Sequence, residues 1–578
     1  MLITALAVII RSIPAWMNAA WGVDFGIYFG LTKNIATYGV IFPEYTGWGS
    51  SYNYFPTLYL INVGAHWITG LDILVIMPKL APIFGGLSVF VFYFIVKELI
   101  KDKKIALISS ALLAVSVLHI YQTSHAAPLT IGHFFMMISL YFFIKFQRNP
   151  MFSIPLIAST ALLIFSHHFT TYFYLITITF LTFAYVSKRK KINHQILYII
   201  TYVLFASTAT FAHWIFIATP VYRGFMNVGY FIPPYVVIAA FYVFVILGTF
   251  ISAKFNWFNP LKNINFNFLH FDMDKYKKIA LSFLILLATV IVVSITGIPG
   301  VYIKITPLAI VYALPMLFVL ALSYAGLSYL SSIRDGFLIK GWFIGIFLSL
   351  TYSLTSASLL PDRHLEYLIV PLCIPAALTL KEIINDHPLR NLKRHTMELI
   401  EPAELSKRFR RNVIASSLIA ILFIANLIAA YPAIDSLNAI DERVSEPCVN
   451  TLDWMAGNVN NMSIFASDHR LEMLIWAEGF GITYGKTNTT WFAENLSEYK
   501  DELIQLNVTH IVVDDIMRDG VVNVDVGKYY YMTNESYEKF NYTPFKLIYR
   551  NATYDNEDEE IHWVEVYQVD RSILMKDE

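Results

Sequence analysis

Charged residues and cysteines are scarce in this chain, and each scarcity excludes a class of protein. Only 15% of the 578 residues are charged, whereas 56% are hydrophobic, a composition too apolar for a soluble globular protein. The two cysteines, Cys373 and Cys448, provide no disulfide framework. Gly-x-Gly-x-x-Gly and phosphate-loop motifs are absent, as are internal repeats, so nucleotide binding is unsupported and no nucleic-acid partner is expected.

Long apolar runs recur through the first 431 residues and predict an α-helical polytopic membrane domain over residues 1–431. A span needs roughly 20 apolar residues to cross about 30 Å of hydrocarbon. The run 54–70 is apolar but short, and we expect a helix there that lies on the outer surface. We place thirteen transmembrane helices near residues 2–18, 73–96, 105–119, 130–146, 151–166, 172–187, 196–218, 235–253, 279–296, 306–330, 337–358, 365–380 and 413–431.

The first of these spans begins at Met1 and carries Arg11. No small-residue cleavage site follows it, so we expect a retained helix rather than a signal peptide.

The formal net charge of zero hides a separation of charge along the chain. Of the 42 basic and 42 acidic residues, 11 and 27 lie in residues 432–578, which leaves −16 there and +16 in residues 1–431. Lysine and arginine gather in alternate loops, as at 188–191, 275–278 and 407–411, and the positive-inside rule makes those loops cytoplasmic. With thirteen spans, the N-terminus is then cytoplasmic and the tail extracytoplasmic, at the cell membrane.

The tail, residues 432–578, reads as a soluble external α/β domain. Its seven N-glycosylation sequons, with none before residue 450, support an external location; they begin at Asn461, Asn488, Asn495, Asn507, Asn534, Asn541 and Asn551. Strand-like runs at 463–466 and 509–515 alternate with helical runs at 449–455, 471–477 and 497–506, which predicts a small parallel sheet. The segments 545–550 and 562–570 flank an acidic turn and predict a hairpin.

Few carboxylates are expected at the outer face of the membrane part, and Asp24 is the most informative of them. It follows the first span, in Trp21-Gly-Val-Asp-Phe-Gly-Ile-Tyr28. An acid at a water–lipid boundary is where an enzyme acting on a lipid-borne substrate needs one, because ionisable groups at membrane depth are costly and mark sites. The alternative is that Asp24 is only the N-cap of a helix over residues 25–38.

Other candidates lie at predicted outer span ends. Pro361-Asp-Arg-His-Leu-Glu366 is the densest polar cluster, and Arg363 could bind a lipid phosphate bidentately, unless it only pairs with Asp362 or Glu366. Glu366 and His168 are further candidates for substrate or phosphate binding, although a buried histidine is often structural. Lys304 and Arg223 could sit near a diphosphate or merely extend to the interface. His125 is a candidate metal ligand.

The order of these features resembles the GT-C superfamily of polyprenyl-phosphate-dependent glycosyltransferases. The resemblance rests on a first span with Arg11, the loop motif Val23-Asp-Phe-Gly-Ile-Tyr28, an aromatic surface helix at 52–70, and the segments 97–104 and 111–121. Thirteen spans and an external tail are similar to the archaeal oligosaccharyltransferase catalytic subunit. The resemblance implies a dolichyl- or polyprenyl-phosphate-linked donor in the bilayer, a glycan or protein acceptor and protein glycosylation. It also implies that Asp24 is a catalytic base or metal ligand.

If the resemblance extends to a divalent metal such as Mg or Mn, the partners of Asp24 would be His125, His167 or Glu44. Departures from the family pattern narrow the function. The tail lacks Trp-Trp-Asp-Tyr-Gly, residues 297–305 lack the Thr-Ile-x-Glu motif, and residues 121–130 lack the second acidic pair. These absences favour transfer of a single sugar from a polyprenyl-phosphate donor, or a member without activity, over an oligosaccharyltransferase.

Two other functions are compatible with the sequence. A transporter or flippase of a lipid-linked substrate would share the spans and buried charges, although the inverted halves typical of transporters are not evident. A non-catalytic membrane protein whose tail binds carbohydrate is the second. For the enzyme, we expect Asp24 and Arg363 to face a common cavity at the outer leaflet, because unpaired charges among apolar residues are costly.

Overall fold

The computed structural model describes residues 1–190, 192–226, 233–255, 275–297, 306–354, 360–385, 417, 419–431, 441–525 and 528–575. The chain divides into two compact units. The helical unit consists of Met1–Ile10, Gly85–Gln122 and Gly132–Leu437, and the loop–tail unit consists of Arg11–Phe84, Thr123–Ile131 and Asn438–Glu578. The tail therefore shares its unit with the first predicted external loop.

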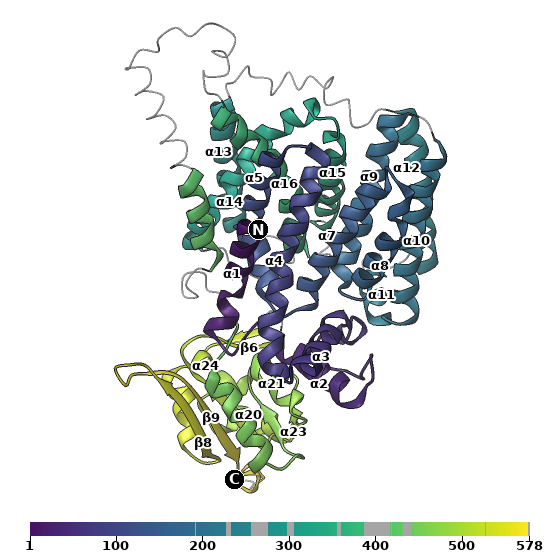
Figure 1. Ribbon diagram of the computed structural model, residues 1–578. Coiled ribbons are helices and arrows are strands. Elements are labelled where there is room, and N and C mark those ends of the chain that lie inside the picture. Colours follow the sequence, from purple (N-terminus) through teal and green to yellow (C-terminus); the bar gives the residue numbers. More distant parts are fainter. Residues whose placement is uncertain are drawn as a thin grey trace, which may run out of the picture. The chain divides into compact units, whose positions relative to one another are not determined.

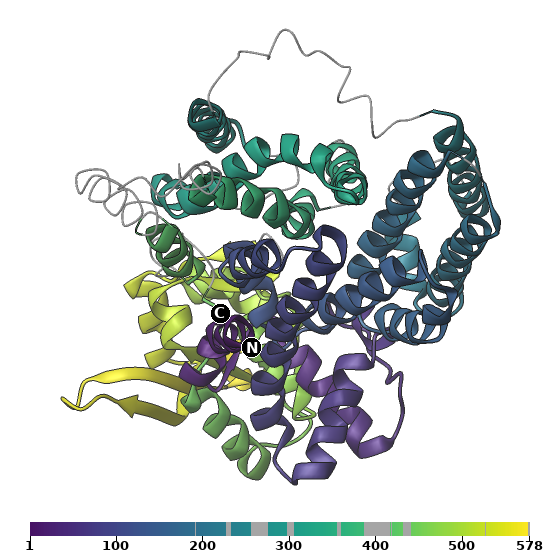
Figure 2. The same ribbon diagram turned by 45° about the horizontal axis from the view of Figure 1, so that its top comes forward.

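Most of the described chain before residue 431 is helical, as the apolar runs predict. In the helical unit, α9, α10 and α12 run alongside one another (Figures 1 and 2). The helices of this part are α1 (Leu2–Met17), α4 (Ile73–Ile100), α5 (Lys103–Ala114), α6 (Val117–Ser124), α7 (Pro128–Phe146), α8 (Ser153–Ile164), α9 (His168–Arg189), α10 (His194–Phe216), α11 (Thr219–Met226), α12 (Pro234–Lys254), α13 (Lys275–Thr296), α14 (Pro307–Gly326), α15 (Gly336–Ser353) and α16 (Pro361–Asn385).

Among the described residues, nine helices are long and apolar enough to cross a membrane, or ten if α5 and α6, bent by 62°, form one span. The predicted count of thirteen is therefore too high by this criterion. Three of the predicted spans coincide with shorter apolar helices of 10–17 residues, Leu2–Met17, Pro150–Ile164 and Ile419–Ala430. Hydropathy detects an apolar run whatever the helix length, and a helix of 12 residues such as α8 extends only about 18 Å at 1.5 Å per residue.

The first predicted external loop forms two helices of the loop–tail unit, α2 (Phe25–Tyr38) and α3 (Thr57–Thr69). The run 54–70, predicted as a short helix rather than a span, accordingly contains a helix of 13 residues. Just before α2, strand β1 (Ala20–Trp21) pairs antiparallel with β2 (Arg443–Val444) at the start of the tail. This pairing ties the loop to the tail.

The tail contains the predicted mixture of strands and helices. Its five-stranded sheet has the order β4-β3-β5-β9-β8, parallel between β4, β3 and β5 and antiparallel between β5, β9 and β8. The prediction of a parallel sheet is thus right for three strands, and the predicted hairpin completes the same sheet. The strands are β3 (Ile464–Ala466), β4 (Gly481–Ile482), β5 (His510–Asp514), β6 (Val522–Asp525), β7 (Lys528–Tyr530), β8 (Phe545–Tyr554) and β9 (Glu560–Val569).

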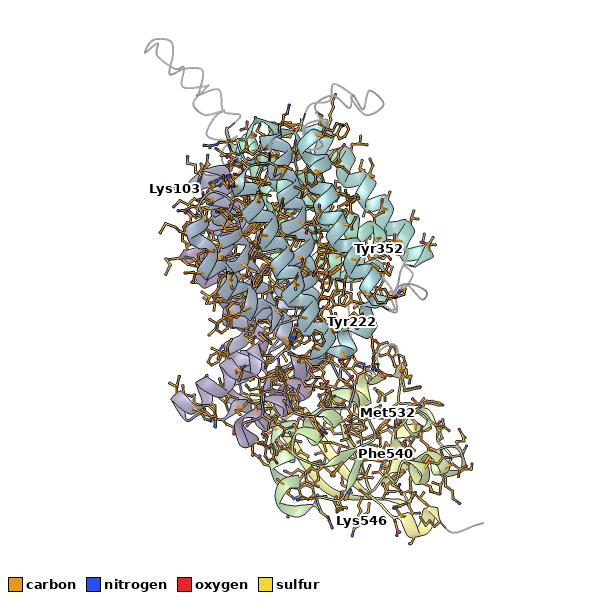
Figure 3. The ribbon with its side chains drawn as sticks, turned by 90° about the vertical axis from the view of Figure 1, so that its right-hand side faces the viewer. Lys103, Tyr222, Tyr352, Met532, Phe540 and Lys546 are labelled. Carbon is orange, nitrogen blue, oxygen red and sulfur yellow. The ribbon has the colours of Figure 1, made fainter. Side chains whose placement is uncertain are left out.

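The core of the tail lies where its helices meet this sheet. All five residues of β5 are buried, which fits its position between two other strands. Phe540, labelled in Figure 3, is buried with its ring 5.0 Å from that of Phe545 and 5.3 Å from that of Tyr567. The helices are α20 (Glu446–Asn458), α21 (His469–Ala477), α22 (Thr489–Phe492), α23 (Leu496–Gln505), α24 (Asp515–Asp519), α25 (Asn534–Glu538) and α26 (Arg571–Leu574).

Candidate functional site

Asp24 stands at the N-cap position of α2, but its side chain makes no capping hydrogen bond. Oδ1 instead lies 3.2 Å from Nε2 of His469, and Oδ2 lies 3.4 Å from the hydroxyl of Tyr28, which can donate to it. The carboxylate remains 24% exposed. A residue that only capped the helix would direct an oxygen at the backbone N–H groups of the first turn. The side-chain contacts of Asp24 therefore differ from those of a residue that is only an N-cap.

His469 is the first residue of α21 and its side chain is only 6% exposed. Burial lowers the pKa of His469, but the hydrogen bond and charge of Asp24, together with the charges of Glu472 and Asp468, outweigh burial and raise it above the ordinary value of 6.5. The histidine is therefore held toward its protonated form beside the carboxylate, as expected for an opposite charge within a few ångströms.

Aromatic side chains surround this pair. The Trp48 ring meets the His469 ring edge to face at 5.1 Å, and the rings of Tyr28 and Tyr52 meet in the same way, also at 5.1 Å. Such rings limit the access of water and strengthen electrostatic interactions between the groups that they enclose. The pair consequently combines a partly exposed carboxylate with a buried histidine.

The predicted metal ligands are divided between the two units, and His125 has contacts of its own. Nε2 of His125 lies 2.6 Å from Oε2 of Glu442, and its ring stacks on Trp21. Glu44 is exposed, and His167 belongs to the helical unit. Within the part of the chain that the structure describes, no group of three or more His, Cys, Asp and Glu side chains is arranged to hold a metal ion. The divalent ion expected from the resemblance stays a prediction.

Arg363 and Glu366 lie one turn apart near the start of α16, in the helical unit. Nη1 of Arg363 donates to Oε1 of Gln122 on α6. Glu366 accepts from Nε2 of His133 on α7, and both of those side chains are buried. Arg363 thus contacts α6, whereas the carboxylate of Glu366 contacts a histidine of α7.

The contacts of Glu366 continue through the membrane helices. The ring of His133 stacks on Tyr367 at 4.7 Å, and the Tyr367 hydroxyl lies 2.7 Å from Oγ1 of Thr170. Thr170 in turn lies 2.9 Å from Nδ1 of His167, the N-cap of α9. Two candidates from the sequence, Glu366 and His167, therefore belong to one buried polar chain, which we call the helical polar chain (His133, Glu366, Tyr367, Thr170 and His167).

The remaining candidates are His168, whose ring centre lies 4.8 Å from that of His167, together with Arg223 and Lys304. His168 is partly buried beside the ring of Phe225, 6.3 Å between ring centres. Arg223 is exposed on α11. Lys304 falls outside the residues that the structure describes, so its predicted role stays a prediction.

The sequence reasoning missed two residues, His469 and His133. His469 stands in Asp468-His-Arg-Leu-Glu472, four ionisable residues in five positions at the start of α21, and that density is a signal. His133 is an ionisable residue inside a predicted span, which by itself marks a polar contact within the helices. Neither pattern identifies the distant partner, because Asp24 and Glu366 lie hundreds of residues away in the chain.

No protein-family model matches the chain, and no curated protein is significantly similar in sequence. Three similar solved structures have identities of only 11–12%. ArnT from Cupriavidus metallidurans in the apo state has a TM-score of 0.45 and 12% identity, over 100% of this chain and 98% of ArnT. The same protein bound to undecaprenyl phosphate has a TM-score of 0.43 and 12% identity, over 98% and 97%.

The third is the arabinofuranosyltransferase AftD from mycobacteria, with a TM-score of 0.46 and 11% identity, over 98% of this chain but 39% of AftD.

Proposed function

We propose that this chain is a GT-C-type membrane glycosyltransferase that moves a sugar from a polyprenyl-phosphate-linked donor to a glycan or protein acceptor at the outer membrane face. The observation that supports this most is the state of Asp24. Its carboxylate is partly exposed, makes no capping bond to its own helix and lies beside a buried histidine. A carboxylate kept available in this way is suited to accept a proton.

In the proposed reaction, the acceptor hydroxyl oxygen attacks the anomeric carbon of the donor sugar. The bond from that carbon to the phosphate oxygen breaks, and its electron pair stays on the polyprenyl phosphate. The hydroxyl proton passes to a carboxylate oxygen of Asp24. Charge grows on the phosphate during this step, so a cation beside it lowers the barrier.

Arg363 is the proposed cation, because a guanidinium can donate two parallel hydrogen bonds to a phosphate. Arg223 and Lys304 remain proposed as further phosphate contacts. Asp24 and Arg363 belong to different units, so the common cavity expected from the sequence stays a prediction.

The proposal includes the orientation expected from the lysine and arginine distribution, with a cytoplasmic N-terminus and an extracytoplasmic tail. Asp24 and the tail would then be on the outer side, where a donor carried by a lipid presents its phosphate to an external acceptor.

Asp24→Asn tests the proposal in membranes supplied with radiolabelled polyprenyl-phosphate sugars. We expect release of polyprenyl phosphate to fall by at least about 100-fold, since general base catalysis contributes 10²–10⁴-fold. The matched control is Asp72→Asn. Asp72 lies in the same unit, and its Oδ1 accepts from the backbone N–H of Leu74 at the start of α4. Because asparagine caps about as well as aspartate, Asp72→Asn should leave transfer unchanged.

Arg363→Lys is expected to raise KM for the donor roughly tenfold with a smaller effect on kcat, because lysine keeps the charge but loses the two-pronged geometry. KM and kcat measured over a range of donor concentrations check this. Full transfer by Asp24→Asn would place the base elsewhere. Movement of intact labelled donor across vesicles without any release of polyprenyl phosphate would instead identify a transporter.

A further inference from the structure

The tail contributes a side chain to the surroundings of the proposed base. Asp24 stands just before α2 and His469 begins α21, and the two are 445 positions apart in the chain. The histidine is almost fully buried, whereas the carboxylate is about one quarter exposed. In the Asp24–His469 pair, the carboxylate of Asp24 is therefore the group that an acceptor can reach, and the His469 ring is buried.

A close contact between two helices brings these residues together. Gly26 and Gly30, one turn apart on α2, lie directly against α21. A Cβ atom at Gly26 would come within 2.5 Å of the backbone nitrogen of Leu474, and one at Gly30 within 2.4 Å of the Trp476 ring. Only glycine allows helices to approach so closely. At the far end of the same contact, Lys33 of α2 pairs with Glu478 at 2.7 Å.

The start of α21 is itself fixed on the tail. Asp468 caps the helix by accepting from the backbone N–H of Leu471 at 2.9 Å. The buried guanidinium of Arg470 lies 2.6 Å from Asp514 and 3.2 Å from Asp468, and it also donates to the carbonyl of Arg443. His469 thus stands between two anchored residues, so its ring has little freedom to move away from Asp24.

The geometry of the hydrogen bond between His469 and Asp24 indicates the role of His469. Its Nε2 faces Oδ1 of Asp24, while among the described residues Oδ2 of Asp24 has only the long 3.4 Å contact with the Tyr28 hydroxyl. Holding one oxygen by a hydrogen bond orients the carboxylate and leaves the second oxygen for an acceptor proton. A shift of about 1 Å in such a group costs roughly 100-fold in rate.

We propose that His469 is a positioning residue for Asp24, so that the tail completes the catalytic site of the transfer reaction. This inference rests on the proposed function. It assigns to the tail a part in catalysis itself, through the contact of α2 with α21, in addition to any part in acceptor binding.

The test compares His469→Leu with His469→Gln in the full-length protein, using release of polyprenyl phosphate from radiolabelled polyprenyl-phosphate sugars. Leucine fills a similar volume but cannot donate a hydrogen bond, whereas the glutamine amide can place a donor near the position of Nε2. We expect His469→Leu to lower kcat roughly 100-fold with KM for the donor changed less than about twofold. His469→Gln should recover kcat to within about tenfold of the wild type.

His510→Leu is the matched control. His510 is also a buried tail histidine, stacked on Phe465 at 4.9 Å, and its bonded neighbour is Thr509. The His510→Leu substitution should leave kcat unchanged. Thermal unfolding of each variant checks folding, and the comparison uses kcat per folded molecule, so a variant that merely unfolds is recognised.

Equal losses of kcat in His469→Leu and His469→Gln would overturn the inference, because the hydrogen-bond donor would then be irrelevant. Full activity in His469→Leu would overturn it as well. Either result together with an inactive Asp24→Asn variant would refute only the role of His469. Full activity in Asp24→Asn would instead refute the proposed function.

Discussion

The pairs Asp24–His469 in the loop–tail unit and Glu366–His133 in the helical unit each join a histidine to a carboxylate, and they differ in exposure. In the loop–tail unit, Asp24 is 24% and His469 6% exposed. In the helical unit, Glu366 is 2% and His133 0% exposed. A carboxylate that water can reach exchanges protons and can meet a substrate, whereas one enclosed by helices mainly fixes how those helices associate. The same chemical pair thus suits catalysis in one unit and helix assembly in the other.

The burial of the helical pair leaves further polar atoms without partners. Among the described residues, Nδ1 of His133 and Oε2 of Glu366 are buried with no hydrogen bond. Each unsatisfied group costs free energy, so this pair has little tolerance for the loss of its one remaining bond. The Asp24–His469 pair, with its outer oxygen exposed, does not carry that penalty.

His133→Leu is the change expected to have the largest effect on stability. It leaves the Glu366 carboxylate buried without its donor, which costs about 3–5 kcal/mol in the free energy of unfolding. Thermal unfolding in detergent measures the loss. The control is His194→Leu, at an exposed histidine at the start of α10, which should change stability by less than about 0.5 kcal/mol. An unchanged melting temperature in His133→Leu would mean that the helical pair does not hold the helices together.

Glu472→Gln tests the titration of a buried carboxyl near His469 in the loop–tail unit. Burial raises the pKa of Glu472, one turn after His469, to about 7. A carboxyl with a raised pKa favours folding at low pH and loses that contribution as the pH rises through about 7. The glutamine side chain stays neutral at every pH. The free energy of unfolding of Glu472→Gln relative to the wild type should therefore rise between about pH 4.5 and pH 7, toward an upper bound on the order of 3 kcal/mol.

The measurement for Glu472→Gln is the melting temperature as a function of pH. Glu498→Gln, at an exposed residue of α23, serves as the control and should follow the wild-type curve. A constant difference between Glu472→Gln and the wild type at every pH would contradict the expected titration.

Gly26→Ala tests the helix contact that supports the exposed pair, and it has the smallest expected effect. The added methyl group meets backbone atoms of α21 that cannot move aside, so we expect a loss of about 1–3 kcal/mol. Gly64→Ala is the matched change in α3 of the same unit, where a Cβ meets nothing within 4 Å. It should be neutral or stabilise by up to about 1 kcal/mol. Equal melting temperatures for the two variants would show that the contact is not tight.

Much of the fold was predictable because lipid imposes a simple rule on the backbone. Apolar runs such as 172–187 and 365–380 must be helical, since hydrocarbon offers no hydrogen-bonding partner, and α9 and α16 cover them. Helix length was less predictable, as α8 illustrates, because hydropathy does not detect where a helix bends or stops. In the tail, the alternation of strands and helices identified the α/β class but not the mixed sheet.

The candidate site was predictable only in part. Asp24 is conspicuous because the surrounding sequence is apolar and the loop motif resembles a known family. Its contact with His469 depends on two glycines and a two-stranded ribbon, β1 with β2, whose pairing no local pattern encodes. Sequence spacing reveals which residues share one helix face, but it does not reveal which distant helix that face will meet.

The β1–β2 ribbon has a consequence for how the protein is made. Ala20 pairs with Val444 and Trp21 with Arg443, so about 420 residues must be synthesised before β1 can find its partner. At roughly 5–20 residues per second, the first loop waits on the order of 20–85 seconds for the ribosome to deliver the tail. During that interval the glycine face of α2 and the unpaired strand are open to chaperones and proteases. A chain whose synthesis stops before the tail therefore exposes the unpaired β1 and the glycine face of α2 near its N-terminus.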